Sequence, residues 1–316
     1  MDFGYHYHSF GTGNGRTHAE AIERKVESLE SAGFEWISCM DHLWQIGLNG
    51  QPDDPFFDAY TTLPAIAALT DTVEVAALVT CPLYRNPALL GRMLTTLDHI
   101  SDGRAVLGIG AGWAEHEIRA YGYDFPEISE RVRRMTETIE LVKKMWTEPS
   151  PVSYQGEYYD ISELRLKPKP LRDPHPPILI GGSGEQLTLR AVAEHADRWN
   201  IPSTGPDELA DKLAVLEEHC DTFDREYQEI DKTVVHWAVI GDTTADAHGR
   251  YESLKSRTDA GPAPRDDHRG LVGTPDDIVD ELTRYEELGV DMFMLKVLEG
   301  DDETLDRFHA EVMGSF

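Results

Sequence analysis

The sequence predicts a closed (β/α)8 barrel, the TIM-barrel type of α/β fold, in a single domain over residues 1–316. Three observations lead to this prediction. Short apolar runs rich in strand-forming residues alternate with longer runs at helical spacing, the strand-like runs number eight, and they show little apolar–polar alternation. Alternating strands and helices build parallel sheets whose strands are buried on both faces. Eight such units in a chain of 316 residues are typical of a barrel.

The elements follow one another regularly along the chain. The expected strands are FGYHYH (3–8), FEWISCMD (34–41), VEVAALVT (73–80), RAVLGIGAG (104–112), PPILIGGSG (176–184), DRWNIP (197–202), TVVHWAVIG (233–241) and DMFMLKV (291–297). The expected helices lie within 18–33, 59–70, 87–101, 115–123, 129–146, 185–196, 206–223, 244–256 and 274–289, with a last helix after 297.

Two stretches do not fit one strand–helix unit each. The segment 150–177, between the helix of the fourth unit and the fifth strand, is too long for a plain connection. Its core YQGEYY predicts an insertion in the form of a small hairpin or a lid. The segment SRTDAGPAPRDDHRG (256–270) is rich in Pro, Gly and charge, which indicates a loop.

The charge balance excludes several classes of partner. Asp and Glu number 58 against 29 Lys and Arg, a formal net charge of −29 that is spread along the chain. Nucleic acids and anionic membranes both require a basic surface, so we expect neither as a partner. We interpret the acidity as adaptation to high salt, where a dense carboxylate surface stays hydrated and its repulsion is screened; an ordinary acidic protein is the alternative.

The cysteines and the apolar segments indicate where the protein resides. The three cysteines have no spacing typical of a zinc site or a disulfide framework. No basic-then-apolar leader and no run of 18 apolar residues is present. We therefore expect a soluble, cytoplasmic protein.

In a barrel of this type the active site lies at the carboxyl ends of the strands. That rule selects His6, His8, Asp41, His42, Thr80, Cys81, Gly110 to Trp113, Gly181 to Gly184, Asn200, His236 and Lys296.

His6-Tyr7-His8 raises the possibility of a metal site, because residues two apart in a strand point to the same side. A metal-dependent hydrolase would use such a pair. However, the fourth, fifth and sixth strands end in GIGAG, LIGGSG and WNIP, which supply no ligands, and two histidines alone hold a metal poorly. We expect no metal, and the histidines remain either pocket walls or caps of a strand end.

Two glycine-rich strand ends predict a flat, phosphorylated ligand. In PPILIGGSGEQLTLR a strand runs into Gly181-Gly182-Ser183-Gly184 and a helix is expected at once, an arrangement whose free N–H groups bind phosphate; a tight turn that binds nothing is the alternative. In LGIGAGWAEHE the glycines make room for a flat ring. Trp113 either stacks on that ring or covers the core, and Glu117 reads as a solvated helix residue.

Asp41 and His42 are adjacent at the end of the second strand, so their side chains face opposite ways. Histidine is the usual general acid or base near neutral pH, which makes His42 the candidate proton carrier. For Asp41 a loop-capping role is the alternative. No serine or cysteine nucleophile accompanies them in an elbow motif, which argues against acyl-transfer hydrolysis.

These motifs together resemble the bacterial luciferase-like superfamily and, within it, the oxidoreductases that use coenzyme F420, a deazaflavin. The resemblance runs over nearly the whole chain and is carried by MDHL (40–43), LVTCPLYRNPALLG (78–91), LGIGAGWAEHEIRAYGYDFP (107–126), PPILIGGSGEQLTLRAVAEHADRWN (176–200) and GTPDDIVDELTRYEELGVDMFML (273–295).

The resemblance implies a barrel with an insertion, usually dimeric, and a set of site residues. Gly181, Gly182 and Ser183 would hold the cofactor phosphate, and Asp41 would position the ring while His42 faces the reacting centre. The ring would rest on a bulge of the third strand, where the family often has a non-proline cis peptide. The residues of that bulge and of the ring lining would be Ala77, Leu78, Thr80, Gly110 and Gly112.

One departure matters for the substrate. The sugar-phosphate and alcohol dehydrogenases of the family place a Glu just after the glycines of the fourth strand, where this chain has Trp113. Basic residues for a substrate phosphate are also not evident at matching positions, which puts a sugar phosphate in doubt.

The sequence therefore predicts an F420-dependent oxidoreductase that transfers a hydride between the deazaflavin and a small organic substrate. Asp41 and His42 would be catalytic, and His6, His8 and Trp113 would contact the substrate, with Trp113 also against the cofactor. An FMN-dependent monooxygenase of the same superfamily is the first alternative and a metal-dependent hydrolase the second. A homodimer is the expected assembly.

Overall fold

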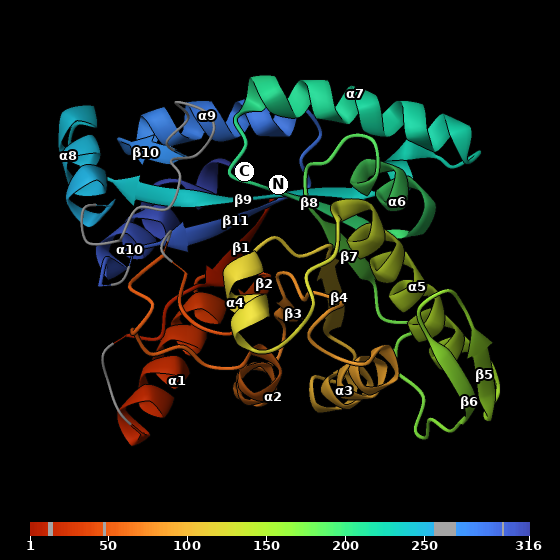
Figure 1. The fold of residues 1–316 in the computed structure, drawn as a ribbon. Helices are drawn as coiled ribbons and strands as arrows, with labels where there is room; N and C mark the ends of the chain where they lie inside the picture. Colours follow the sequence, from red (N-terminus) through yellow and green to blue (C-terminus); the bar gives the residue numbers. More distant parts are fainter. Residues whose placement is uncertain (12–14, 47–48, 256–269, 299) are drawn as a thin grey trace.

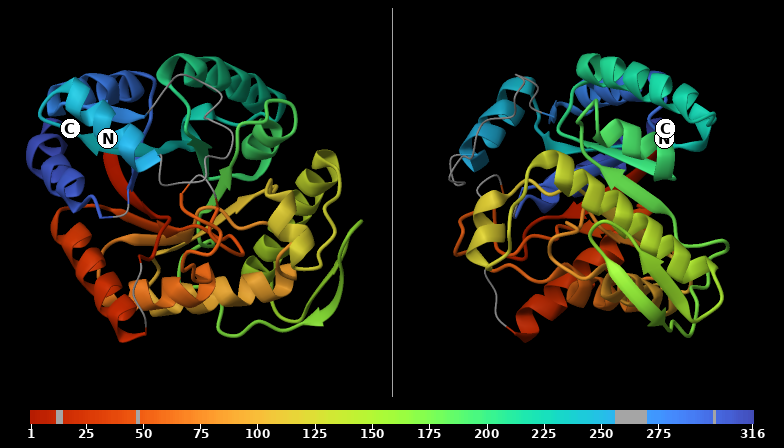
Figure 2. Two further views of the ribbon diagram at one scale, coloured as in Figure 1. Left: turned by 60° about the vertical axis from the view of Figure 1, so that its left-hand side comes forward. Right: turned by 45° about the vertical axis from the view of Figure 1, so that its right-hand side comes forward.

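The strands of the chain close into a parallel barrel surrounded by helices (Figures 1 and 2). The computed structural model describes residues 1–11, 15–46, 49–255, 270–298 and 300–316. Within them the ring order is β1-β2-β3-β4-β7-β8-β9-β11, and pairing of β8 with β9 and of β11 with β1 closes it. The bounds are β1 (Asp2–Tyr7), β2 (Trp36–Cys39), β3 (Glu74–Ala77), β4 (Ala105–Gly110), β7 (Ile178–Gly181), β8 (Arg198–Pro202), β9 (Asp231–Ile240) and β11 (Met292–Val297).

The predicted barrel and all its strands are thus confirmed. A further strand, β10 (Leu271–Gly273), pairs in parallel with the end of β9 outside the ring and was not expected. It contains only 3 residues, too few to show a periodic pattern.

The helices form the outer layer. They are α1 (Arg16–Ser31), α2 (Ala59–Leu69), α3 (Pro87–Ile100), α4 (Glu115–Ala120), α5 (Ile128–Thr147), α6 (Thr188–His195), α7 (Pro206–Thr222), α8 (Thr244–Lys255), α9 (Pro275–Glu287) and α10 (Asp302–Glu311). In α1 the buried Ile22, Val26 and Leu29 recur at helical spacing and face the barrel. At the start of α9, Thr274 and Asp277 form a capping box that satisfies two of the free N–H groups of the first turn.

Successive strand residues alternate between two apolar layers. One set of side chains fills the inside of the barrel: Trp36, Ala76, Leu78, Val106, Leu179, Val235, Met292 and Met294. The residues between them point outward into the larger core that joins the barrel to the helices, as Ile37, Val75 and Leu107 do. The interior is therefore a packed plug, and the polar residues of interest lie beyond it at the carboxyl ends of the strands.

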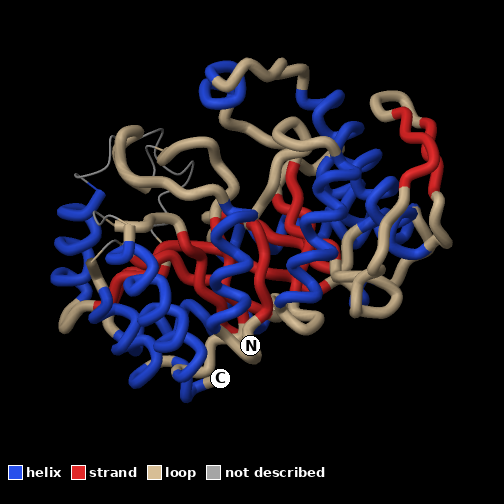
Figure 3. Tube along the Cα trace, turned by 90° about the horizontal axis from the view of Figure 1, so that it is seen from below, coloured by secondary structure: helices blue, strands red, loops and turns tan. Residues whose placement is uncertain are grey.

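The insertion is a hairpin of β5 (Val152–Gln155) and β6 (Asp160–Leu164), paired antiparallel. Glu137 of α5 accepts hydrogen bonds from the backbone N–H groups of residues 157–159 at its tip, and Glu140 of α5 accepts one from the Tyr154 hydroxyl at 2.8 Å. The hairpin stands beside the helix layer, apart from the barrel strands (Figure 3). The antiparallel pair lies within the segment where an insertion is expected, and α5 holds its tip beside the helix layer.

The described helices include none that is both long and apolar enough to span a bilayer. The predicted loop over 256–270 lies, apart from its last residue, outside the described residues.

Candidate active site

The carboxyl ends of the eight ring strands meet at one face of the barrel, and the structure brings most of the predicted site residues together there. His6 lies on β1 and His8 directly follows it. Asp41 and His42 follow β2, and Thr80 follows the bulge after β3. His236 is the exception among the selected residues. It is fully buried next to Trp237 on β9, and the alternation of the strand turns it away from the barrel interior.

His42 is held by a buried carboxylate. Its Nδ1 donates to Oε1 of Glu117 over 2.6 Å, and Glu117 is 1% exposed. The same carboxylate accepts the Tyr84 hydroxyl at 2.6 Å and the backbone N–H of Leu43 at 2.9 Å. Burial raises the pKa of the Glu117 carboxyl, but the hydrogen bonds from His42, Tyr84 and Leu43 more than offset this and leave the pKa below its usual value.

Glu117 therefore stays ionised and fixes the proton of His42 on Nδ1. None of the described residues contacts the other ring nitrogen, Nε2, by a hydrogen bond. The expectation that Glu117 is a solvated helix residue is wrong. α4 turns it inward because the next residue, Ile118, packs into a small apolar cluster with Cys81 and Tyr84.

The rim beside His42 is aromatic. The Trp113 ring lies 5.7 Å from the His42 ring at an interplanar angle of 74°, and Trp113 is 60% exposed. Trp44 packs 5.2 Å from the His116 ring, and the Tyr121 hydroxyl donates to the Leu43 carbonyl at 2.9 Å. Trp113 is therefore a rim residue available to a ligand above His42, and it does not cover the core.

Asp41 points the opposite way from His42, as adjacency predicts. Its two oxygens take a bidentate contact from Arg85 at 2.5 and 2.9 Å, and one of them also accepts the Thr80 hydroxyl at 2.5 Å. Burial raises the pKa of the Asp41 carboxyl, and Arg85 and Thr80 offset part of that rise. Arg85 reaches Asp58 as well, at 2.8 Å. Sequence reasoning missed Arg85, although it lies in the LYRNPALLG motif.

The glycines of β4 and β7 make room for the bulge that follows β3. A Cβ atom on Gly108 would overlap the Ala77 carbonyl, and Cβ atoms on Gly110 and Gly181 would lie 2.7 and 2.9 Å from the Val79 side chain. The Leu78–Val79 peptide is cis. These glycines therefore let the bulge after β3 approach closely, and their contact with a ring stays a prediction. Gly112, with φ +77°, likewise faces the Cys81 sulfur.

The loop after β7 is anchored from β8 and open on its other side. The Gly182 N–H donates to the Asn200 carbonyl at 3.0 Å, and the Trp199 indole donates to the Gly182 carbonyl at 2.8 Å. Ser183 and Gly184 are exposed, and their N–H groups have no acceptor among the described residues. The helix does not start at once: α6 begins at Thr188, whose N–H donates back to the Gly184 carbonyl at 3.0 Å.

His6 and His8 form a buried wall on β1. The His6 Nδ1 lies 2.9 Å from the Ser38 hydroxyl, and the His8 Nδ1 lies 3.3 Å from the His6 carbonyl. Burial, followed by the charge of Lys296, lowers the pKa of both rings, that of His8 to about 3. Both are therefore neutral. Within the described part of the chain, no group of three or more His, Cys, Asp or Glu side chains is arranged to hold a metal ion.

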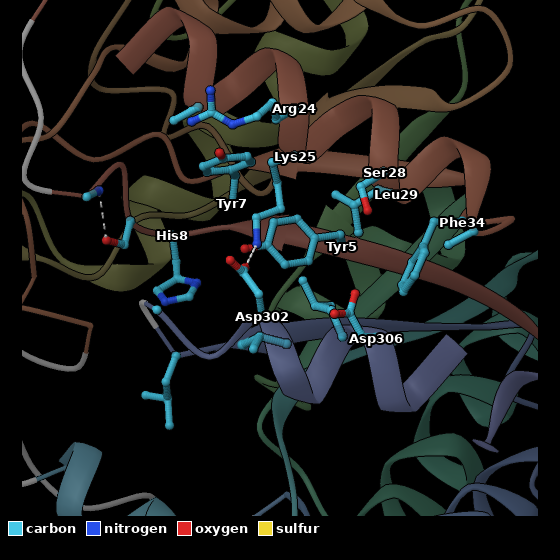
Figure 4. Close-up of a pocket in the computed structure, with 18 of the residues that line it drawn as sticks. Tyr5, Tyr7, His8, Arg24, Lys25, Ser28, Leu29, Phe34, Asp302 and Asp306 are labelled. Carbon is cyan, nitrogen blue, oxygen red and sulfur yellow. Dashed lines mark hydrogen bonds and ion pairs between the residues drawn. The ribbon is translucent and has the colours of Figure 1, made fainter. Parts of the chain in front are cut away.

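A cavity of about 780 Å³ lies outside the barrel wall, between α1 and α10 (Figure 4). Tyr5 and Tyr7 line its floor, and an ion pair between Lys25 and Asp302 spans it. His8 also lines it. The cavity therefore borders the candidate site at β1 but does not contain His42.

Known proteins share both the fold and stretches of the sequence. Over 100% of this chain and 99% of the other, the structure superposes on an F420-dependent secondary alcohol dehydrogenase in complex with an F420–acetone adduct, with a TM-score of 0.83 and 18% identity. An F420-dependent glucose-6-phosphate dehydrogenase of Amycolatopsis mediterranei is 25% identical over 79% of this chain and 80% of that protein.

A FMNH2-dependent dimethylsulfone monooxygenase of Pseudomonas putida is 34% identical over 178 residues, which are 56% of this chain and 47% of the relative. The match thus spans about half the length of that relative. The family model described as luciferase-like monooxygenase matches residues 1–292. The chain therefore belongs to the luciferase-like monooxygenase family.

Proposed function

We propose that this protein is an F420-dependent oxidoreductase that transfers a hydride between the deazaflavin and a small organic substrate. The His42–Glu117 pair is the observation that carries the proposal. It places a histidine of fixed tautomer at the barrel mouth with one ring nitrogen free for a ligand. The F420-dependent relatives support the choice of cofactor, because one of them aligns over most of both chains.

The residues at the mouth fit a phosphorylated, flat cofactor. Gly181, Gly182 and Ser183 would hold its phosphate, because the exposed N–H groups of Ser183 and of the neighbouring Gly184 have no acceptor among the described residues. Its ring would lie against the bulge and the strand-four glycines. The residues proposed for that contact are Ala77, Leu78, Thr80, Gly110, Gly112 and Trp113. When bound, the deazaflavin supplies the hydride donor or acceptor.

His42 would exchange the accompanying proton with a substrate oxygen through Nε2. Glu117 keeps the Nδ1 proton in place and stabilises the imidazolium that forms when Nε2 takes up a proton. Asp41 would position the cofactor ring by holding the neighbouring backbone in place. Its contacts with Arg85 and Thr80 fix the end of β2 against the bulge on which the ring would rest.

The specific alternative is an FMN-dependent monooxygenase. The 34% identity with the dimethylsulfone enzyme favours it, and the same loop would hold the FMN phosphate. The two functions differ in the cofactor bound and in whether oxygen is consumed.

Separate titrations with oxidised F420 and with FMN, followed by absorbance and calorimetry, test the proposal. We expect F420 to bind more tightly than FMN. Gly182→Val should weaken F420 binding, because Gly182 has φ +135° and its Cβ position lies 3.2 Å from Thr188. Gly122→Val, also at positive φ but with no neighbour within 4 Å, controls for backbone strain. Tight binding of FMN with none of F420 would refute the choice of cofactor.

We also propose a cytoplasmic homodimer. On α3, Leu89 and Ile100 are 52% and 44% exposed and lie 11 residues apart, which places them on the same side of the helix. Light scattering after size exclusion should give twice the chain mass, and Leu89→Glu should give the monomer. A monomeric wild-type protein would contradict this.

A further inference from the structure

Lys296 projects into the barrel mouth from the last ring strand. It pairs in register with Trp237 of β9, and its Nζ lies 4.7 Å from the centre of the Trp237 ring. On its other side is β1, where Tyr5 pairs with Leu295 and His6 therefore comes next to Lys296. The His8 ring contacts the same tryptophan edge-on at 4.8 Å. One ammonium group thus faces a wall of neutral rings.

No carboxylate of the described residues pairs with this ammonium group. In a chain with 58 acids and 29 Lys and Arg, that is an uncommon position for a cation. Arg85, which also lies near the mouth, is by contrast paired with Asp41 and Asp58. The face of the Trp237 ring stabilises the ammonium charge by a cation–π contact. The indole has no lone pair that could accept a hydrogen bond from the three N–H groups of the ammonium.

Burial lowers the pKa of Lys296 to about 8, so the group is still largely charged at neutral pH. The titratable groups that its charge reaches are His6 on β1 and His8 directly after it, and His42 with its partner Glu117 follows the next strand, β2. Since His6 and His8 are neutral, neither ring adds a second positive charge beside Lys296.

The position of β11 separates Lys296 from the proposed phosphate loop. In the ring, β11, β1 and β2 are consecutive, whereas the loop follows β7, which is three strands from β11. Lys296 therefore lies on the side of His42, where the substrate would bind, and not on the side of the cofactor phosphate.

We propose that Lys296 binds a singly charged oxyanion of the substrate, so that the substrate is an organic acid with a carboxylate or sulfonate group. That the bound anion is the substrate rests on the proposed function, whereas the anion site itself is inferred from the geometry around Lys296. A single ammonium matches one negative charge, whereas a phosphate monoester usually requires several cations. Trp237 and His8 would pack against the apolar part of the acid.

Ligand-observed NMR titrations test the site with small probes, with and without F420 present. The probes are acetate, benzoate, methanesulfonate and benzenesulfonate, with acetamide and benzamide as neutral counterparts. We expect the anions to bind and Lys296→Met, which keeps the apolar stem over Trp237, to weaken them by about 10-fold to 100-fold. Lys296→Arg should keep most of the affinity. Lys25→Met, which removes a cation paired with Asp302 outside the barrel, should change nothing.

The pH dependence gives a test on the wild-type protein alone. Affinity for the anions should fall as the pH rises through about 8, because Lys296 loses its proton, while the amides should show no such change. Equal anion binding by wild type and a folded Lys296→Met would overturn the proposal, as would anion binding that is unchanged between pH 7 and pH 10. If the anions bind as expected but neither F420 nor FMN does, the proposed function fails and the anion site remains.

Discussion

At the scale of single residues, the candidate site depends on contacts between distant parts of the chain. Glu117 is separated from His42 by 75 positions, yet it determines which ring nitrogen of His42 faces the mouth. Arg85 similarly joins Asp41 to Asp58. These two pairs fix the end of β2, where the proposed proton transfer takes place.

We predict that Glu117→Gln lowers kcat by about 10-fold to 100-fold, because the amide no longer stabilises protonated His42. F420 binding should be unchanged, and the pH profile of kcat should shift to lower pH, because protonated His42 loses its carboxylate partner. Glu115→Gln, on the exposed side of α4 and paired with Arg119, is the matched control and should behave as wild type. Identical pH profiles for wild type and Glu117→Gln would contradict the positioning role.

Glu117 also makes stability depend on pH. Its folded-state pKa is below the ordinary value, so its contribution is fully present above about pH 4.3, the unfolded value, and is lost as the pH falls through the folded value. The difference in unfolding free energy between wild type and Glu117→Gln, measured by urea denaturation, should therefore shrink as the pH is lowered from 6 toward 3. A constant difference over that range would show that the ionised Glu117 carboxylate does not cause the pH dependence of stability.

His6→Ala and His8→Ala should impair turnover while leaving cofactor binding nearly intact, because both rings lie on β1, across the mouth from the glycine loop on β7. Both variants create a small buried cavity, so thermal melting is measured beside kcat. A loss of F420 affinity equal to the loss of turnover would place these histidines at the cofactor instead.

The types of residue at the mouth were predictable from the sequence, but their partners were not. Strand ends carrying Asp41, His42 and glycines indicate a ligand site, because parallel strands end at one face. The role of Glu117 depends on how α4 docks, which Ile118 and its apolar neighbours decide through tertiary packing. Nothing in the local pattern EHEIRA distinguishes Glu117 from Glu115.

At the scale of elements, the bulge after β3 packs closely against β4 because β4 carries a glycine, with no side chain, at the point of contact. The Ala77 carbonyl occupies the space of a Cβ on Gly108, and the Thr80 N–H donates to the Gly108 carbonyl at 2.9 Å. The bulge therefore has its shape because β4 carries glycine at this point. The sequence located the bulge through the family resemblance, whereas the close approach to Gly108 is visible only in the structure.

Gly108→Ala should lower the free energy of unfolding by about 1–3 kcal/mol, because the added methyl group forces β3 and β4 apart. It should also weaken F420 binding. Gly249→Ala is a control in the exposed face of α8, with no atom within 4 Å, and should raise stability by about 0.5–1 kcal/mol. A Gly108→Ala variant as stable as wild type would contradict the account of the bulge.

Periodicity predicted the strands because each has a continuous apolar run, but it placed the start of α6 wrongly. Residues 185–187 carry helix-forming side chains, yet they form a turn that closes on the Gly184 carbonyl. The helix propensity of single residues does not predict such a backbone hydrogen bond to Gly184. For the same reason β10, stabilised by pairing with β9, escaped prediction.

At the scale of the whole molecule, the charge of −29 is the dominant feature. The acidic side chains outnumber the basic ones two to one, so the excess carboxylates repel one another across the surface. Added salt shortens the range of that repulsion to about 3 Å at 1 M. Melting temperature and activity should therefore rise from dilute buffer to molar KCl. Highest stability in dilute buffer would contradict the interpretation of the acidity.

The central claim is that the mouth of this barrel binds a deazaflavin and exchanges hydride with a substrate. The most direct measurement is the absorbance of oxidised F420 mixed with the protein in the absence of oxygen, while alcohols, hydroxy acids and hydroxysulfonates are added in turn. The account predicts that one of these substrates bleaches the deazaflavin, and that His42→Ala slows the bleaching without releasing the cofactor. If no substrate bleaches F420, while reduced FMN with this protein consumes oxygen in the presence of a substrate, the account is contradicted.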